Sequence, residues 1–107
     1  MENYAEAILR QICGERSPDV PDWKYDVLRS VLFSSTRVRG VSTKEHINMT
    51  AELALTDKRQ LVAFMEQYGT SEAKNTLEPF FQLSESRINT ILKILREQFR
   101  GVIFRQE

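Results

Sequence analysis

Apolar residues recur every three or four positions along most of this chain, which is the period of an amphipathic α-helix. The pattern predicts helices over about residues 3–15, 23–33, 57–68, 71–81 and 84–96. Glycine and proline are scarce, with four and three residues, whereas strand-rich folds need many turns. The sequence therefore predicts a mainly α-helical protein.

Polar residues and chain breakers mark where these helices should begin and end. Side chains that can accept a hydrogen bond from the first helical turn are the predicted N-caps: Asp22, Thr56, Thr70 or Ser71, and Ser84. Gly69 is expected to end the helix before it in a left-handed conformation. Pro79 is expected to interrupt its helix, because proline lacks an N–H and clashes with the preceding turn.

The segment over residues 46–55 fits two patterns. Ser42 and Glu45 match a capping box, and the apolar residues that follow can form one side of a helix. Five apolar residues in this segment also alternate strictly, as in a half-buried strand: Ile47, Met49, Ala51, Leu53 and Leu55. Alanine, methionine, glutamate and leucine favour helices over strands, so a helix is the preferred interpretation.

The last third of the chain carries the best-specified helix. Ser84 can cap it, and five residues form its apolar stripe: Ile88, Ile91, Leu92, Leu95 and Phe99. Residues 102–104 could continue this helix, but their β-branching and the preceding Gly101 favour a short C-terminal β-strand. With no linker or repeat visible, the sequence predicts a single domain over residues 1–107, a compact bundle of five or six helices.

Charge and cysteine content narrow the function. The net charge is zero, with 15 acidic and 15 basic residues, so no overall field attracts a polyanion. Cys13 is alone, which excludes an intramolecular disulfide and favours a reducing, cytoplasmic location. No segment approaches the roughly 20 apolar residues of a membrane span. We therefore expect a protein that does not enter the membrane.

The chain lacks the usual signals of catalysis. Its four glycines are isolated, so no loop can cradle a phosphate. Cys13 and His46 could pair as nucleophile and base, but Cys13 is expected to be a small buried apolar residue and His46 an exposed residue of a first helical turn. One histidine and one cysteine are too few for a structural zinc site. No enzymatic activity, metal or small-molecule cofactor is expected.

From Asp57 onward, about half of the chain resembles the winged helix-turn-helix core of small bacterial transcription regulators. Residues 57–68 and 71–81 match its first two helices, and Leu83 with Ser84 fills the turn. Residues 84–96 match its recognition helix and residues 102–105 the start of its wing. The chain departs from the family at Glu78, Gln82 and Phe99, where small residues or glycine are usual.

The resemblance implies a set of DNA contacts on the helix over residues 84–96. In the major groove arginine suits guanine and asparagine suits adenine. The residues that would face the bases are Ser86, Arg87, Asn89, Thr90 and Lys93. The residues that would contact phosphates are Arg96, Arg100 and Arg105. DNA binding is the alternative function.

Aromatic residues suggest a surface for another protein. Phe80, Phe81 and Phe99 belong to a set of aromatic side chains larger than a minimal bundle always hides, and aromatic patches are typical of binding hot spots. Without catalytic residues, a helical domain most often acts by contact. The preferred function is therefore a non-catalytic binding or regulatory module that contacts a protein partner or a second copy of itself.

Overall fold

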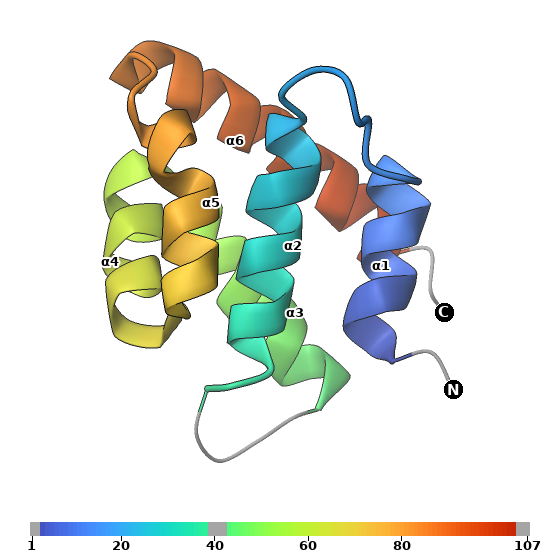
Figure 1. The fold of residues 1–107 in the computed structure, drawn as a ribbon. Coiled ribbons are helices and arrows are strands. Elements are labelled where there is room, and N and C mark those ends of the chain that lie inside the picture. Colours follow the sequence, from blue (N-terminus) through green and yellow to red (C-terminus); the bar gives the residue numbers. More distant parts are fainter. Residues whose placement is uncertain (1–2, 39–42, 105–107) are drawn as a thin grey trace.

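The structure is a computed structural model that describes residues 3–38 and 43–104, and six α-helices are found in this part of the chain (Figure 1). The helices are α1 (Tyr4–Cys13), α2 (Trp23–Ser35), α3 (Lys44–Ala54), α4 (Lys58–Tyr68), α5 (Ser71–Phe81) and α6 (Glu85–Phe104). They pack into one bundle around a common apolar core. The prediction of a mainly helical protein is confirmed.

Helix α2 lies at the centre of the bundle and contacts all five other helices. Four of its apolar side chains are fully buried: Val27, Leu28, Val31 and Leu32. Its small polar residues are buried too, and the Ser35 hydroxyl donates a hydrogen bond of 2.8 Å to the Val31 carbonyl. Because α2 is enclosed on several sides, its polar residues need partners within the protein.

Helix α6 begins beside the end of α5 and runs across the bundle to α1 (Figure 1). Its predicted apolar stripe is confirmed, because Ile88, Leu92, Leu95 and Phe99 are buried and Ile91 is half-buried. Burial of each large apolar side chain stabilises the fold by about 1.5 to 3 kcal/mol. The stripe therefore fixes α6 on the bundle and leaves its other side in solvent.

Most of the predicted caps are correct. Asp22, Thr70 and Ser84 each accept a hydrogen bond from the backbone N–H three residues later. The cap predicted at Thr56 is wrong by one residue, because the Asp57 side chain accepts from Gln60 N–H at 2.9 Å. Gly69 ends α4 with an extended backbone (φ −73°, ψ 146°) rather than the predicted left-handed one.

The ambiguous segment over residues 46–55 is helical and belongs to α3. Its N-cap is Thr43, whose hydroxyl accepts from His46 N–H, whereas Ser42 lies outside the described residues. Pro79 does not interrupt α5, which continues to Phe81. Pro79 removes one backbone hydrogen bond from the last turns of α5, and the burial of Leu77 and Phe80 on either side of it holds the helix together.

The predicted C-terminal strand is wrong, because residues 102–104 continue α6. A glycine costs a helix about 1 kcal/mol, but Val102 and Ile103 pack against the core. This packing outweighs the cost of Gly101 and the preference of β-branched residues for strands. The described residues therefore contain no wing strand, and Arg105 lies outside them.

Candidate interaction surface

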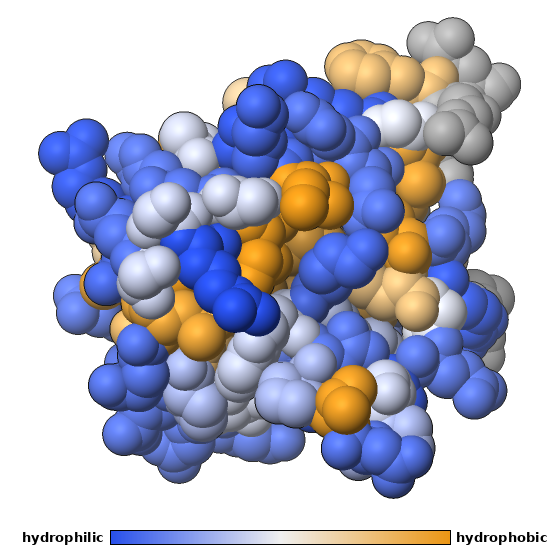
Figure 2. Space-filling view, turned by 90° about the horizontal axis from the view of Figure 1, so that it is seen from above, coloured by the Kyte–Doolittle hydropathy of each residue, from blue (hydrophilic) through white to orange (hydrophobic). Residues whose placement is uncertain are grey.

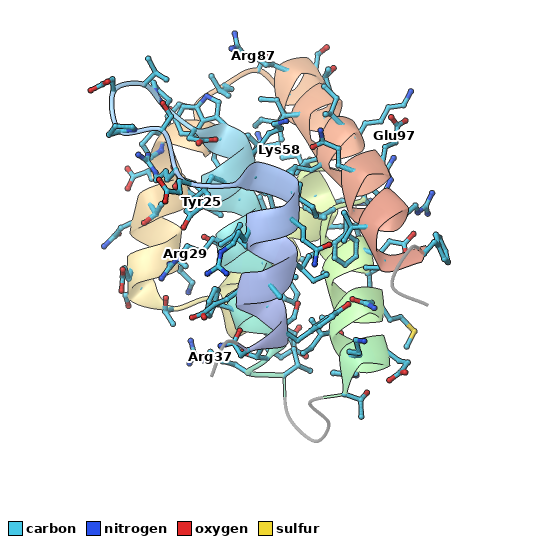
Figure 3. All side chains as sticks on the ribbon, turned by 90° about the vertical axis from the view of Figure 1, so that its right-hand side faces the viewer. Tyr25, Arg29, Arg37, Lys58, Arg87 and Glu97 are labelled. Carbon is cyan, nitrogen blue, oxygen red and sulfur yellow. The ribbon has the colours of Figure 1, made fainter. Side chains whose placement is uncertain are left out.

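The outer side of α6 carries four of the eight residues for which a DNA contact was expected, and Arg105 lies outside the described residues. Ser86, Arg87, Thr90 and Lys93 are all exposed, and the Thr90 hydroxyl donates to the Ser86 carbonyl at 3.0 Å. Figure 3 shows Arg87 near the start of the helix, pointing away from the bundle. The face formed by α6 is mostly hydrophilic, and its apolar areas are small and separated (Figure 2).

The other three residues contact neighbouring helices, and two of them, Asn89 and Arg96, lie at the junction between α3 and α4. Asn89 Oδ1 accepts from Lys58 N–H at 2.9 Å, in the first turn of α4. Arg96 Nη1 donates to the carbonyls of Leu55 and Thr56 at 2.9 and 2.8 Å, at the end of α3. A cation suits the carbonyl end of a helix, and an amide oxygen suits the N–H end.

Arg100 is the third of these residues of α6. It forms an ion pair with Glu52, which lies on α3 one turn before the helix ends. Asn89 and Arg96 therefore hold α3 and α4 against α6, whereas the exposed Arg100–Glu52 pair adds little. One polar atom of each of the three side chains has a partner in the protein, which makes these residues less available to a nucleic acid.

Two of the three phenylalanines expected at a protein interface are core residues. Phe80 and Phe99 are fully buried, so the expectation that they form a surface is wrong. Phe80 packs against Trp23 and Phe81, with ring centroids 5.8 and 5.7 Å apart. Phe81 is half-buried and lines a shallow hollow between α4 and α5. The aromatic residues follow the apolar stripes of their helices, and burial in the core is the usual outcome.

The surface with the clearest binding character is a groove of about 340 Å³ between α3 and α4. Ala54, Ala63, Phe64 and Tyr68 supply much of its apolar lining, and Val38 lies at its end next to α2. Phe64 and Tyr68 contact one another with ring centroids 5.4 Å apart. The polar members of the lining are His46, Thr50, Gln60 and Gln67.

Two large apolar side chains of α3 that line this groove are also largely exposed to solvent. Met49 is 68% exposed and Leu53 is 61% exposed. Two residues along an α-helix correspond to a rotation of about 200°, so these side chains lie opposite Ile47, Ala51 and Leu55, which are buried. The alternating apolar residues of this segment therefore lie in two rows on opposite sides of a helix, one row buried and the other exposed.

The groove also lacks charge and contains an unpartnered polar atom. Among the described residues, none that lines the groove is Asp, Glu, Lys or Arg, although charged residues make up 28% of the chain. His46 Nε2 is buried without a hydrogen-bond partner, the one such side-chain nitrogen or oxygen in the described ranges. His46 is half-buried, so the prediction of an exposed first-turn residue is wrong.

Cys13 lies elsewhere, at the end of α1, half-buried against the core. Burial, and then the negative charge of Asp22, raises the pKa of this thiol to about 11. A cysteine nucleophile is the thiolate, so Cys13 stays protonated and unreactive near neutral pH. Cys13 is also absent from the lining of the groove that contains His46.

A second hollow lies between α1 and α2 and carries charges of both signs. Three arginines line it together with two glutamates: Arg10, Arg16, Arg29, Glu6 and Glu15. Arg16 is already paired with both carboxylate oxygens of Asp26, at 2.9 and 3.0 Å. Arg29 stacks on Phe33, with Cζ 5.0 Å from the ring centroid. Figure 3 shows Tyr25 and Arg29 on α2, with Arg37 just beyond the end of that helix. These pairings leave no single-sign surface for a charged ligand.

The described residues contain no group of three or more His, Cys, Asp or Glu side chains that could hold a metal ion. No helix in residues 3–38 or 43–104 has the length and apolar content needed to cross a membrane. Comparisons of the chain with protein-family models, with curated proteins and with solved structures gave no match.

Proposed function

We propose that this chain is a non-catalytic protein-binding module whose partner docks in the groove between α3 and α4. The observation that carries the proposal is the uncharged character of the described lining, which includes two exposed apolar residues, Met49 and Leu53. The central parts of protein interfaces are depleted in charge and enriched in methionine and aromatic residues. The same composition is found in this groove.

The shape of the groove supports a particular mode of binding. A hollow between two helices suits a row of apolar side chains spaced three or four residues apart on a partner's helix. Its polar residues, Thr50, Gln60 and Gln67, can form hydrogen bonds at the edge without the cost of burying a charge.

Selection of helical peptides from a displayed library tests this proposal. Peptides selected on the protein should bind in the micromolar range and shift the NMR amide signals of α3 and α4. The variant Leu53→Asp should weaken binding at least tenfold, because it places a charge beside an apolar contact. The matched control is Ile94→Asp, which alters an apolar residue of α6 that is 43% exposed. Failure to select any peptide, or shifts confined to other helices, would contradict the proposal.

DNA binding by α6 is the second proposal, and one observation favours it. Arg87 and Lys93 are exposed, and neither forms an ion pair with any described residue. A DNA duplex labelled for fluorescence anisotropy should bind more weakly as salt rises, because phosphate contacts release counterions. Changing both Arg87 and Lys93 to alanine should abolish that binding. Absence of binding at low salt would contradict this second proposal.

A further inference from the structure

A small hollow of about 90 Å³ lies between α2 and α5. The two helices are neighbours and run in opposite directions, so the start of α5 lies beside the end of α2 (Figure 1). One side of α2 lines the hollow with Asp26, Arg29, Ser30, Phe33, Ser34 and, just past the helix, Arg37. The residues of α5 that line it are Thr70, the N-cap, with Glu72, Ala73 and Thr76.

Two serines of α2 are buried at this hollow without a hydrogen-bond partner. Ser30 is 5% exposed and Ser34 is 3% exposed. Neither hydroxyl forms a hydrogen bond with a described residue, whereas the hydroxyl of the neighbouring Ser35 donates to a backbone carbonyl. Buried polar groups in native proteins are normally paired, because an unpaired one costs free energy. The occupant of the hollow is therefore expected to supply the missing partners.

Two arginines at the hollow carry charges that no carboxylate neutralises. Arg29 and Arg37 line it, and neither forms an ion pair with a described residue. The Arg29 guanidinium lies over the Phe33 ring, and this contact holds it beside the hollow. Positive charge next to unpaired hydroxyl donors favours an anion as the occupant.

The carboxylates of the lining reduce this positive charge without cancelling it. Asp26 is already paired, because both of its oxygens accept from Arg16. Glu72 is exposed and forms no ion pair with a described residue. Two arginines therefore face one unpaired carboxylate, and the hollow keeps a net positive charge.

The first turn of α5 forms the opposite wall. The Thr70 hydroxyl accepts from Ala73 N–H at 3.0 Å, which satisfies one backbone donor of this turn. The remaining first-turn N–H groups have no acceptor within the helix. The positive end of the helix dipole also favours an anion here.

We propose that this hollow binds a small tetrahedral oxyanion: inorganic phosphate, or the phosphoryl group of a small phosphomonoester. Ser30 and Ser34 donate hydrogen bonds to its oxygens, and Arg29 and Arg37 neutralise its charge. The volume of about 90 Å³ holds several waters, and thus one such ion, whereas larger organic ligands need a bigger pocket. The site is separate from the α3/α4 groove and does not depend on the proposed function.

Titration of isotope-labelled protein with inorganic phosphate, followed by NMR, tests the inference. Sodium chloride keeps the ionic strength constant, so that screening does not change during the titration. Amide signals of the second half of α2 and the first turn of α5 should shift and saturate. We expect a dissociation constant of about 0.1 to 1 mM, because a small ion makes few contacts and both arginines are exposed. Absence of saturation up to about 20 mM phosphate, well above this range, would overturn the inference.

A parallel titration with glycerol phosphate distinguishes the two sources of the oxyanion. Both ligands carry the same phosphoryl oxygens, so both should shift the same amide signals. Tighter binding of the ester would assign the site to a phosphorylated small molecule, and tighter binding of phosphate would assign it to the free ion. Shifts of either ligand confined to other helices would overturn the inference.

Variants of the serines separate binding from folding. Ser34→Ala should weaken phosphate binding about tenfold, because it removes a hydrogen bond to a charged ligand. It should not lower the melting temperature of the ligand-free protein, since this hydroxyl has no partner there. Ser30→Ala should behave in the same way. Loss of stability with unchanged phosphate affinity in both variants would overturn the role of these hydroxyls.

Variants of the charged residues should change the affinity in opposite directions. Changing both Arg29 and Arg37 to alanine should weaken binding about tenfold, whereas Glu72→Gln should tighten it about threefold by removing a like charge. The matched control is Arg59→Ala, which alters an exposed arginine of α4 and should bind as the unmodified protein does. Circular dichroism shows whether each variant is folded. Weaker binding by Glu72→Gln, or an equal loss in Arg59→Ala, would overturn the inference.

Discussion

Helix α6 and the α3/α4 groove differ in what their residues contact. On α6, hydrogen bonds to neighbouring parts of the protein are formed by three of the residues that were predicted to contact DNA: Asn89, Arg96 and Arg100. In the groove, Met49 and Leu53 are exposed and His46 Nε2 has no partner among the described residues. The polar residues that suggest function in the sequence are thus partly structural, while unpaired apolar residues mark the candidate binding surface.

The difference has a physical origin. A basic or amide side chain on an amphipathic helix can reach a neighbouring helix end, and the backbone groups there need partners. Apolar side chains gain nothing from exposure, and Met49 and Leu53 are exposed on the wall of one uncharged groove. Apolar residues that gather at a groove are typical of an interaction site, whereas isolated ones are not.

The largest difference in stability is expected between a variant truncated in the core and one truncated in the groove. Phe99→Ala should lower the free energy of unfolding by about 3 to 5 kcal/mol, because it leaves a cavity in the core. Leu53→Ala should change it by less than about 0.5 kcal/mol, as expected for an exposed position. Urea denaturation of both variants measures the difference. Similar losses in the two variants would contradict this division between core and surface.

A smaller difference in stability is expected between variants of two basic residues of α6, Arg96, which donates to the end of α3, and Lys93, which is exposed. Arg96→Met should cost about 1.5 to 3 kcal/mol of stability, because the carbonyls of Leu55 and Thr56 lose a charged donor. Lys93→Met should stay within about 0.5 kcal/mol of the unmodified protein. The same denaturation experiment applies. Equal stability of these two variants would show that Arg96 does not hold the α3–α4 junction.

Asn89 should contribute about as much as a helix cap. Asn89→Ala should cost about 1 kcal/mol, since Lys58 N–H loses its acceptor. Asn89→Asp should retain most of the stability, because its carboxylate can still accept and is favoured near a helix N-terminus. Thermal denaturation of the pair measures this effect. A loss in Asn89→Asp as large as in Asn89→Ala would contradict the capping role.

The smallest effect on folding is expected in the groove. Changing both Met49 and Leu53 to glutamine should alter the free energy of unfolding by less than about 0.5 kcal/mol, because both residues are exposed. The same double variant should lose the binding of helical peptides that is proposed for this groove. Urea denaturation, followed by titration with a selected peptide, measures the two effects separately. A large loss of stability would indicate that these side chains belong to the core.

The sequence predicted the helices well because their apolar period is long and regular. Capping predictions succeeded at Asp22, Thr70 and Ser84, where a polar residue directly precedes the apolar pattern. The strand predicted over residues 102–104 failed because contacts with the core outweigh local propensity. Local sequence cannot contain that information.

The candidate site was harder to predict because it combines two helices. Phenylalanine occurs both in cores and at binding surfaces, so residue type alone could not place Phe80 and Phe99. Only the packing shows that both are buried. The alternation of Met49 and Leu53 with buried neighbours was visible in the sequence. The alternation fitted either a strand or a helix. In α3 it corresponds to two rows of apolar residues on opposite sides of the helix, one buried and one exposed.

The absence of charge in the described lining of the groove also has a kinetic consequence. Association through such a surface receives no electrostatic steering, so the rate constant should fall in the unsteered range of about 10⁵ to 10⁶ M⁻¹ s⁻¹. The rate should vary little with ionic strength. Differences in affinity among partners would then arise from how long each complex lasts rather than from how quickly it forms.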